Sequence, residues 1–229
     1  MSAGSTAGLG EARQHLCLAL DTDGEDDAVA LAAELQPWFA VVKVGYQLLL
    51  SAGPGVIVRL ADAGFDVFAD LKLHDIPNTV ENGARAAGRW GVRYLTVHTA
   101  GGPDVLSAAV AGLASTASDA VALGVTVLTS DAHAPPELVA ARADAARQAG
   151  CGGVVCAVTD LPAVGGMRAV TPGIRLAGGC ADDQARISTP GAAIAGGADL
   201  LVVGRTVSGA QDRRGAAEAV ATEVAQALG

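Results

Sequence analysis

The sequence predicts a single-domain (β/α)8 TIM barrel, an α/β fold in which eight parallel strands close on themselves inside a ring of helices. First, eight short runs of Val, Leu, Ile and Ala recur, mostly at intervals of roughly 25 to 32 residues, with helical patterning between most of them. Second, these runs are nearly continuous, as in strands that are buried on both faces of a parallel sheet. Third, a length of 229 residues suits one large domain or two small ones, and the sequence shows no linker or second domain.

The apolar runs mark the expected strands. We expect strands at His15–Asp21, Phe39–Gly45, Asp66–Lys72, Tyr94–Thr99, Ala122–Ser130, Gly152–Thr159, Met167–Arg175 and Asp199–Arg205. Between them, helical spacing predicts helices at Ala28–Gln36, Tyr46–Ala63, Thr79–Trp90, Pro136–Ala149 and Arg213–Leu228. Asp26 or Asp27, in the acidic turn before the first of these helices, is expected to cap it. Only a brief connector separates the sixth run from the seventh.

The alternative fold is an open doubly wound sheet, which also alternates parallel strands with helices. The first turn between a strand and a helix has no GxGxxG sequence, which counts against a dinucleotide-binding sheet. A flavodoxin-like sheet remains open. We expect one barrel over residues 15–229, preceded by a flexible leader over residues 1–14.

Composition limits the classes of partner and compartment. The chain is 51% hydrophobic with a net charge of −9, which argues against a nucleic-acid or anionic-membrane surface. No apolar run reaches the roughly 20 residues that span a bilayer, and residues 1–14 lack the basic and apolar regions of a secretory signal. The four cysteines show neither a CxxC pair nor a zinc-like spacing, so we expect reduced structural thiols in a soluble, cytoplasmic protein. Any phosphate site must be built locally from a few Arg, Lys and backbone N–H groups.

The stretch FADLKLHDIPNT, residues 68–79, places two acids and an amine at the end of the third run. Asp70 and Lys72 are two residues apart, so on a strand their side chains point to the same side. Asp75 follows beyond the expected end of the strand, and Pro77 interrupts the pattern. Two carboxylates beside an ammonium group favour its charged form and orient it, which suits a proton donor. A structural salt bridge at a strand end is the alternative.

Other polar residues also fall at or just beyond the ends of the runs. The full set is Asp21, Lys43, Asp70, Lys72, His98, Thr129, Ser130, Arg175 and Arg205. In a barrel the carboxyl ends of all strands face the same mouth, where barrel enzymes have their active sites. This clustering favours a catalytic site over a structural salt bridge. For His98 we expect a structural hydrogen-bonding role, and we expect no metal site, because no cluster has metal-ligand spacing.

Motifs along most of the chain carry a family resemblance. They are LALD (Leu18–Asp21), KVG (Lys43–Gly45), DLKLHDIPNT (Asp70–Thr79), VLTS (Val127–Ser130), TPGIR (Thr171–Arg175), DDQ (Asp182–Gln184) and VGR (Val203–Arg205). With these motifs the chain resembles the orotidine 5'-phosphate decarboxylases in their short bacterial form. Magnesium-dependent relatives on the same barrel carry a version of DxKxxD but are expected to have an acid on the second strand, where this chain has Lys43.

The resemblance implies conversion of orotidine 5'-phosphate to UMP and CO2 without metal or cofactor, in pyrimidine biosynthesis. It implies catalytic roles for Lys72, Asp70 and Asp75, with Lys72 as the proton donor to C6 of the pyrimidine. The implied substrate-binding residues are Asp21, Lys43, Ile76, Thr79, Thr129, Ser130, Pro172, Arg175, Gln184, Gly204 and Arg205. It also implies a homodimer in which Asp75 and Thr79 reach into the neighbouring site.

A phosphate site is also indicated by the residues themselves. Barrel enzymes often hold phosphate with the loops after strands seven and eight. Here these loops carry Gly178-Gly179 and Gly204-Arg205. Glycine lets backbone N–H groups approach an oxyanion closely, and arginine offers two parallel donors.

Two other functions remain open. One is a magnesium-dependent sugar-phosphate lyase or decarboxylase on the same barrel, which a chelator would inactivate. The other is a catalytically idle protein that binds a phosphate ligand without turnover.

Overall fold

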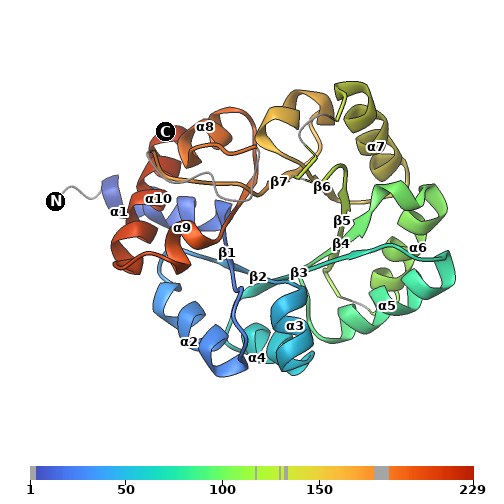
Figure 1. Cartoon of the computed structure of the whole chain (residues 1–229), viewed down its shortest axis with the longest axis horizontal. Helices are drawn as coiled ribbons and strands as arrows, with labels where there is room; N and C mark the ends of the chain where they lie inside the picture. Colours follow the sequence, from blue (N-terminus) through green and yellow to red (C-terminus); the bar gives the residue numbers. More distant parts are fainter. Residues whose placement is uncertain (1–3, 117, 129, 132–133, 178–185) are drawn as a thin grey trace.

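The computed structural model describes residues 4–116, 118–128, 130–131, 134–177 and 186–229. Within these residues, parallel strands β1 to β8 pair in sequence order and β8 returns to β1, which closes a barrel inside a ring of helices (Figure 1). The strands are β1 Leu16–Ala19, β2 Val41–Val44, β3 Asp66–Leu73, β4 Tyr94–His98, β5 Val121–Val125, β6 Gly153–Val155, β7 Ala169–Thr171 and β8 Leu200–Val203. Each strand overlaps one predicted run, and the predicted fold class is confirmed.

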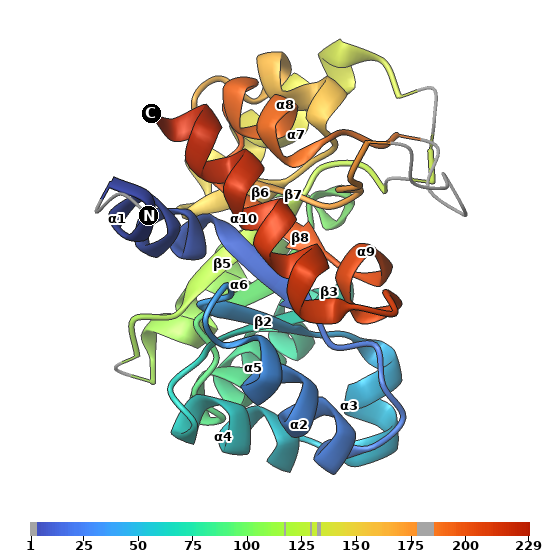
Figure 2. The ribbon, with the colours of Figure 1, turned by 90° about the vertical axis from the view of Figure 1, so that its left-hand side faces the viewer.

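The helices lie around the outside of the barrel (Figures 1 and 2). They are α1 Gly4–Ala12, α2 Glu25–Leu35, α3 Tyr46–Ala52, α4 Gly55–Asp62, α5 Pro77–Arg89, α6 Pro103–Ala114, α7 Pro136–Gln148, α8 Pro190–Ala195, α9 Arg205–Ser208 and α10 Arg213–Leu228. The 3-10 segments η1 Arg13–His15, η2 Thr99–Gly101 and η3 Val158–Val164 lie in the connections. None of the helices in the described ranges combines the length and apolar character that a membrane span requires.

The strands are buried on both faces, which accounts for their unbroken apolar sequences. Cys17 belongs to one buried cluster with Phe68 and Val202, whereas its neighbours Leu16 and Leu18 belong to a second cluster that includes helix residues. Successive side chains of a strand alternate in direction, so one set fills the barrel and the other packs against the helices.

The three described cysteines are buried free thiols. Burial raises the pKa of Cys151 to about 11 and that of Cys156 to about 12. Buried neutral thiols of this kind behave as small apolar side chains, as the sequence predicts.

The predicted helix over Tyr46–Ala63 is wrong in one respect, because the structure divides it into α3 and α4. Gly53 ends α3 with a φ of 76°, a conformation that favours glycine. Pro54 follows directly, and a proline disfavours the helical conformation in the residue before it.

The predicted cap of the helix after β1 is also wrong. Helix α2 begins at Glu25 with Gly24 as its N-cap residue, so neither Asp26 nor Asp27 caps it. Both acids lie in the first helical turn instead, where a negative charge interacts favourably with the helix dipole.

Part of the flexible leader predicted over residues 1–14 is helical in the structure, and residues 1–3 lie outside the described residues. Gly4–Ala12 form α1, which packs against α10 (Figures 1 and 2). Gly8 faces the side chain of Ala225, and Ala12 is buried. The small residues that suggested a loose segment therefore form a helix against the barrel's outer shell.

The connector between β6 and β7 contains η3 in place of an α-helix. Strand β7 is shorter than the predicted run and ends at Thr171. Pro172 follows, and because proline has no N–H it cannot continue the hydrogen-bond ladder. The residues from Pro172 to Arg175 are thereby free to form part of the barrel mouth.

Candidate active site

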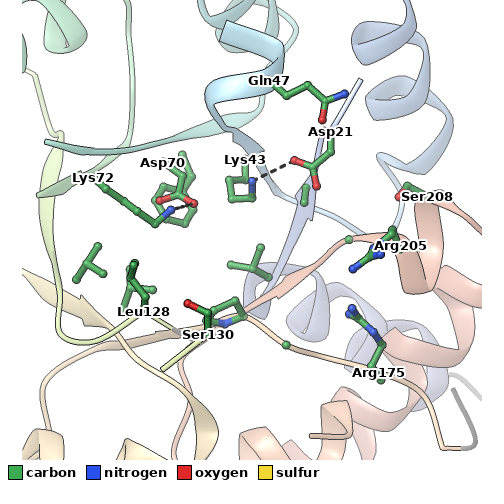
Figure 3. A pocket seen from close by; sticks show the side chains of 18 of the residues that line it. Asp21, Lys43, Gln47, Asp70, Lys72, Leu128, Ser130, Arg175, Arg205 and Ser208 are labelled. Carbon is green, nitrogen blue, oxygen red and sulfur yellow. Dashed lines mark hydrogen bonds and ion pairs between the residues drawn. The ribbon is translucent and has the colours of Figure 1, made fainter. Parts of the chain in front are cut away.

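A cavity of about 570 Å³ opens at the carboxyl ends of the strands (Figure 3). The predicted site residues that line it are Asp21, Lys43, Asp70, Lys72, Ser130, Pro172, Arg175, Gly204 and Arg205. Apolar side chains of the barrel interior, among them Phe68, Val155 and Val202, complete the lining. The barrel thus brings together residues that are far apart in the sequence.

The acid–amine pair of β3 lies at one end of the cavity. Nζ of Lys72 donates a hydrogen bond of 2.8 Å to Oδ2 of Asp70. The other carboxylate oxygen, Oδ1, accepts a hydrogen bond of 3.0 Å from the hydroxyl of Thr96 on β4. Because both oxygens of Asp70 are engaged, the carboxylate is held in one orientation beside the ammonium group.

The backbone at Lys72 departs from a regular strand. Its φ is 44°, and the pairing of β3 with β4 shifts in register between Ala69 and Leu73. The N–H of Lys72 donates to the hydroxyl oxygen of Thr96 at 2.7 Å. Simple strand alternation is therefore an incomplete account of why Asp70 and Lys72 meet. A non-glycine residue in this conformation costs roughly 1–3 kcal/mol, and such residues cluster at functional sites.

Tyr46, which the sequence analysis did not single out, supports the same segment from α3. Its hydroxyl donates a hydrogen bond to the carbonyl oxygen of Leu71, the residue before Lys72. Burial raises the pKa of Tyr46, and the negative charge of Asp70 adds to the rise. The phenol therefore stays protonated and remains a donor at neutral pH.

Asp75, Ile76 and Thr79 lie outside the cavity, between the end of β3 and the first turn of α5. All three are exposed, and Oδ1 of Asp75 accepts a hydrogen bond of 2.7 Å from the N–H of Ile76. Among the described residues, the ion-pair partner of Lys72 is Asp70 alone. The predicted array of two acids around one lysine is not formed within the described part of a single chain.

Asp21 and Lys43 form a second ion pair on the cavity wall. Their Oδ1 and Nζ atoms are 3.4 Å apart, and the side chain of Lys43 is largely buried whereas that of Asp21 is half-exposed. Gln47, a lining residue that the sequence analysis missed, donates from Nε2 to Oδ1 of Asp23 at 2.8 Å. A glutamine at the second position of a helix carries no distinctive sequence signal, so only the fold reveals it.

Arg175 and Arg205 lie at the end of the cavity opposite Lys72 (Figure 3). Arg175 is buried, and its Nη1 donates to the carbonyl oxygen of Ile174 at 2.9 Å. The hydroxyl of Thr206 donates to the same carbonyl at 2.8 Å, which ties α9 to the segment after β7. Ser208 also lines this end, and the sequence analysis missed it.

The lining carries a local excess of positive charge. Among the described lining residues, the cations Lys43, Lys72, Arg175 and Arg205 outnumber the carboxylates Asp21 and Asp70. The chain as a whole has a net charge of −9, so this concentration is specific to the cavity. A site of this kind suits an anionic ligand whose charge extends over the length of the cavity.

Thr129, Gln184 and the Gly178-Gly179 pair lie outside the described residues. Across the ranges that are described, no group of three or more His, Cys, Asp or Glu side chains is arranged to hold a metal ion.

His98 lies near the cavity but does not line it. Its Nδ1 accepts a hydrogen bond of 3.2 Å from the N–H of Ala100, and its ring stacks on His74 with centroids 5.1 Å apart. Burial lowers the pKa of His98, and the positive charges of His74, Arg142 and Lys72 lower it further. The ring is therefore a neutral acceptor, in agreement with the predicted structural hydrogen-bonding role.

Comparison with known proteins shows which family the chain belongs to. A model described as the orotidine 5'-phosphate decarboxylase / HUMPS family matches residues 14–220. The chain belongs to this family. The family resemblance predicted from the motifs is thereby confirmed.

Relatives within the orotidine 5'-phosphate decarboxylase / HUMPS family are similar over nearly the whole chain. The orotidine 5'-phosphate decarboxylase of Halorhodospira halophila (strain DSM 244 / SL1) is 44% identical over 228 residues, which cover 93% of this chain and 97% of the relative. That of Bradyrhizobium sp. (strain BTAi1 / ATCC BAA-1182) is 45% identical, with 94% and 93% covered. The crystal structure of orotidine 5'-phosphate decarboxylase from Lactobacillus acidophilus has a TM-score of 0.78 and 34% identity, with 92% of this chain and 99% of that chain covered.

Proposed function

We propose that this family member is a carboxy-lyase that converts orotidine 5'-phosphate to UMP and CO2, in cytoplasmic pyrimidine biosynthesis. The observation that supports this activity most directly is the layout of the cavity, with the Asp70–Lys72 pair at one end and Arg175 and Arg205 at the other. The names of the relatives, which match over nearly the whole chain, support the same activity.

The charges of the cavity support one orientation of the substrate. The phosphate would bind at the end with Arg175 and Arg205, because arginine offers paired donors to phosphate oxygens. The pyrimidine would then extend towards Lys72, and the ribose hydroxyls would meet the Asp21–Lys43 pair on the wall between. Ser130 and Pro172 would contact the base.

The chemical step breaks the bond between C6 and the carboxylate carbon. CO2 leaves, and the electron pair of that bond remains on C6 of the pyrimidine. The ammonium group of Lys72 stabilises this charge as it develops, because it is already in place beside Asp70 before the reaction begins. Lys72 then donates its proton to C6, and its amine regains a proton from water after UMP has formed.

Asp70 has two effects in this mechanism. Its hydrogen bonds from Lys72 and Thr96 hold the ammonium group in position, so little reorganisation is needed during the reaction. Its charge also repels the substrate carboxylate, which raises the ground-state energy, although this term is contested in general. We assign the larger share of the rate enhancement to Lys72.

The phosphate contributes although it is remote from the bond that breaks. Its binding energy organises the site around the base, so the nucleoside without phosphate is expected to react far more slowly.

The proposal includes a homodimer with two shared sites. Asp75 and Thr79 are exposed and would reach the cavity of the neighbouring subunit, where Asp75 would supply the second acid beside Lys72. Exposed apolar side chains support an interface near these residues, since Ile76 is 64% exposed and Leu50 on α3 is 81% exposed. Isolated exposed apolar residues are common, so the dimer rests on its own test.

The test of the activity is incubation of the purified protein with orotidine 5'-phosphate in the presence of a chelator. We expect loss of the substrate's absorbance and formation of UMP at the same rate with and without chelator. Chelator-sensitive turnover of ketose phosphates would select the magnesium-dependent alternative. Tight UMP binding without turnover would select an idle binding protein.

A further inference from the structure

A buried ion pair lies behind the cavity wall. Nη1 of Arg186 donates to both carboxylate oxygens of Asp160 in η3, each at 2.7 Å. The two side chains are only 10% and 9% exposed, and neither residue lines the cavity. The mechanism above uses neither of them.

The second arm of the same guanidinium reaches the cavity wall. Nη2 of Arg186 donates to the carbonyl oxygen of Leu128 at 3.2 Å, and this oxygen also accepts from the N–H of Asp131 at 2.9 Å. Leu128 and Ser130 line the cavity. Arg186 therefore fixes the backbone of the segment after β5, which is the wall that faces the pyrimidine in the proposed orientation.

Ser188, two residues after Arg186, is hydrogen-bonded to residues at the phosphate end of the cavity. Ser188 accepts a hydrogen bond of 2.9 Å from the N–H of Arg175 and donates one of 3.1 Å to the carbonyl of Gly173. Gly173 and Arg175 line the phosphate end of the cavity. We call the lining residues Val127, Leu128 and Ser130 the base wall, and Gly173 and Arg175 the phosphate wall. The short stretch from Arg186 to Ser188 joins these two walls.

The chemistry of the pair favours a geometrical role. A buried ion pair adds little net stability compared with apolar residues of the same volume, because both charges lose their hydration. The donors of the planar guanidinium point in fixed directions. The hydrogen bonds of Nη1 to Asp160 therefore determine the direction in which Nη2 donates to the carbonyl oxygen of Leu128. A lysine ammonium has no such fixed fork and cannot reproduce both contacts.

We propose that Arg186 is a positioning residue that holds the base wall at Val127, Leu128 and Ser130 in register with the phosphate wall at Gly173 and Arg175. The inference rests on the proposed function. When phosphate binds at Arg175, the Arg186–Ser188 stretch transmits its position to Leu128 and Ser130, and the pyrimidine is placed correctly against Lys72. A misplacement of about 1 Å at a reacting group can lower a rate about a hundredfold.

The test compares Arg186→Lys with a control, Arg147→Lys. Arg147 also pairs with an aspartate, Asp144, and donates to two carbonyl oxygens, but its ion pair is exposed and it does not line the cavity. We expect Arg186→Lys to lower kcat on orotidine 5'-phosphate at least about tenfold while UMP affinity changes less than about threefold. Arg147→Lys should leave both within about twofold of wild type.

A second measurement separates positioning from a purely structural role. It is the ratio of the rate on orotidine 5'-phosphate to the rate on orotidine, which lacks the phosphate. Partial unfolding lowers both rates by the same factor, so their ratio is unchanged. Loss of register between the walls lowers the rate on orotidine 5'-phosphate more, so the ratio should fall at least about fivefold in Arg186→Lys. The double variant Asp160→Asn/Arg186→Met removes both buried charges together and should show the same fall.

An unchanged ratio in both Arg186 variants would overturn the positioning role while leaving the decarboxylase activity intact. Equal losses in Arg186→Lys and Arg147→Lys would also overturn it. A wild-type protein that is inert towards orotidine 5'-phosphate would instead remove the proposed function, and this inference with it.

Discussion

Thr96 donates a hydrogen bond of 3.0 Å to Oδ1 of Asp70, and the same hydroxyl oxygen accepts the backbone N–H of Lys72 at 2.7 Å. One buried side chain on β4 therefore fixes both the acid and the main chain of the proposed proton donor on β3. Asp70 uses its other oxygen for the Lys72 ammonium group. The position of the reacting amine thus depends on a residue that does not line the cavity.

Thr96→Val should test this dependence. Valine has the same shape but leaves Oδ1 of Asp70 and the N–H of Lys72 without their partner, so kcat should fall at least about tenfold. Leaving buried groups unpaired should also cost about 1–3 kcal/mol of stability. Thr126→Val is the matched control, since Thr126 is equally buried and donates to the Val155 carbonyl at 3.0 Å on a neighbouring strand. An equal loss of kcat in both variants would show that Thr96 matters only for stability.

Lys72→Ala should nearly abolish turnover while leaving UMP binding largely intact. The variant removes both the charge that stabilises the carbanion and the proton that C6 receives, whereas the arginines at the other end of the cavity remain. The measurement is single-turnover decarboxylation together with UMP titration by calorimetry. Turnover comparable with wild type would contradict the assignment of Lys72 as proton donor.

The barrel could be predicted from the sequence, because strands that are buried on both faces have nearly continuous apolar sequences. Most residues of its mouth could be predicted as well, because they are polar and follow the ends of these apolar runs. Asp70 and Lys72 were found in this way, as were the arginines that follow β7 and β8. The left-handed conformation of Lys72 could not be predicted, since it is set by the register shift between β3 and β4. Thr96 and Tyr46 were missed for a related reason, because each acts through a partner on another element.

The predicted helix over Tyr46–Ala63 shows the same limit at the level of secondary structure. Its apolar spacing is consistent with helix on both sides of Gly53, so the periodicity gives no sign of the break. The positive φ of Gly53 and the proline after it end α3, and the chain then starts α4 in a new direction. At this point Gly53 and Pro54 determine the end of the helix, although the hydrophobic periodicity continues past them.

Mixing Lys72→Ala and Asp75→Asn subunits should restore activity if sites are shared. In a mixed dimer, one site would receive both substitutions and the other site neither. Random mixing of two inactive variants should then give roughly a quarter of wild-type activity in a symmetric dimer. The comparison is between the mixture and each variant alone, with mixed dimers verified by differently tagged subunits. Verified mixed dimers without activity would remove the claim that Asp75 crosses to the neighbouring site.

His98 predicts how stability depends on pH. Burial, together with the charges of His74, Arg142 and Lys72, lowers the pKa of His98 below the value of 6.5 that applies to an exposed histidine. The unfolded chain therefore binds this proton at a higher pH than the folded chain does, and the free energy of unfolding falls as the pH drops through 6.5. The neutral ring accepts the N–H of Ala100, and a protonated ring cannot accept it.

The variant His98→Gln isolates this effect, because glutamine offers an acceptor oxygen but does not titrate. Thermal unfolding between pH 8 and pH 5 should show a smaller loss of Tm in His98→Gln than in wild type. Histidines that do not contact residue 98 contribute equally to both proteins, so the difference between the two curves belongs to the stacked His74–His98 pair. If the wild-type and His98→Gln curves run parallel through this range, protonation of His98 does not oppose folding, and the ring's role as a neutral acceptor would have to be abandoned.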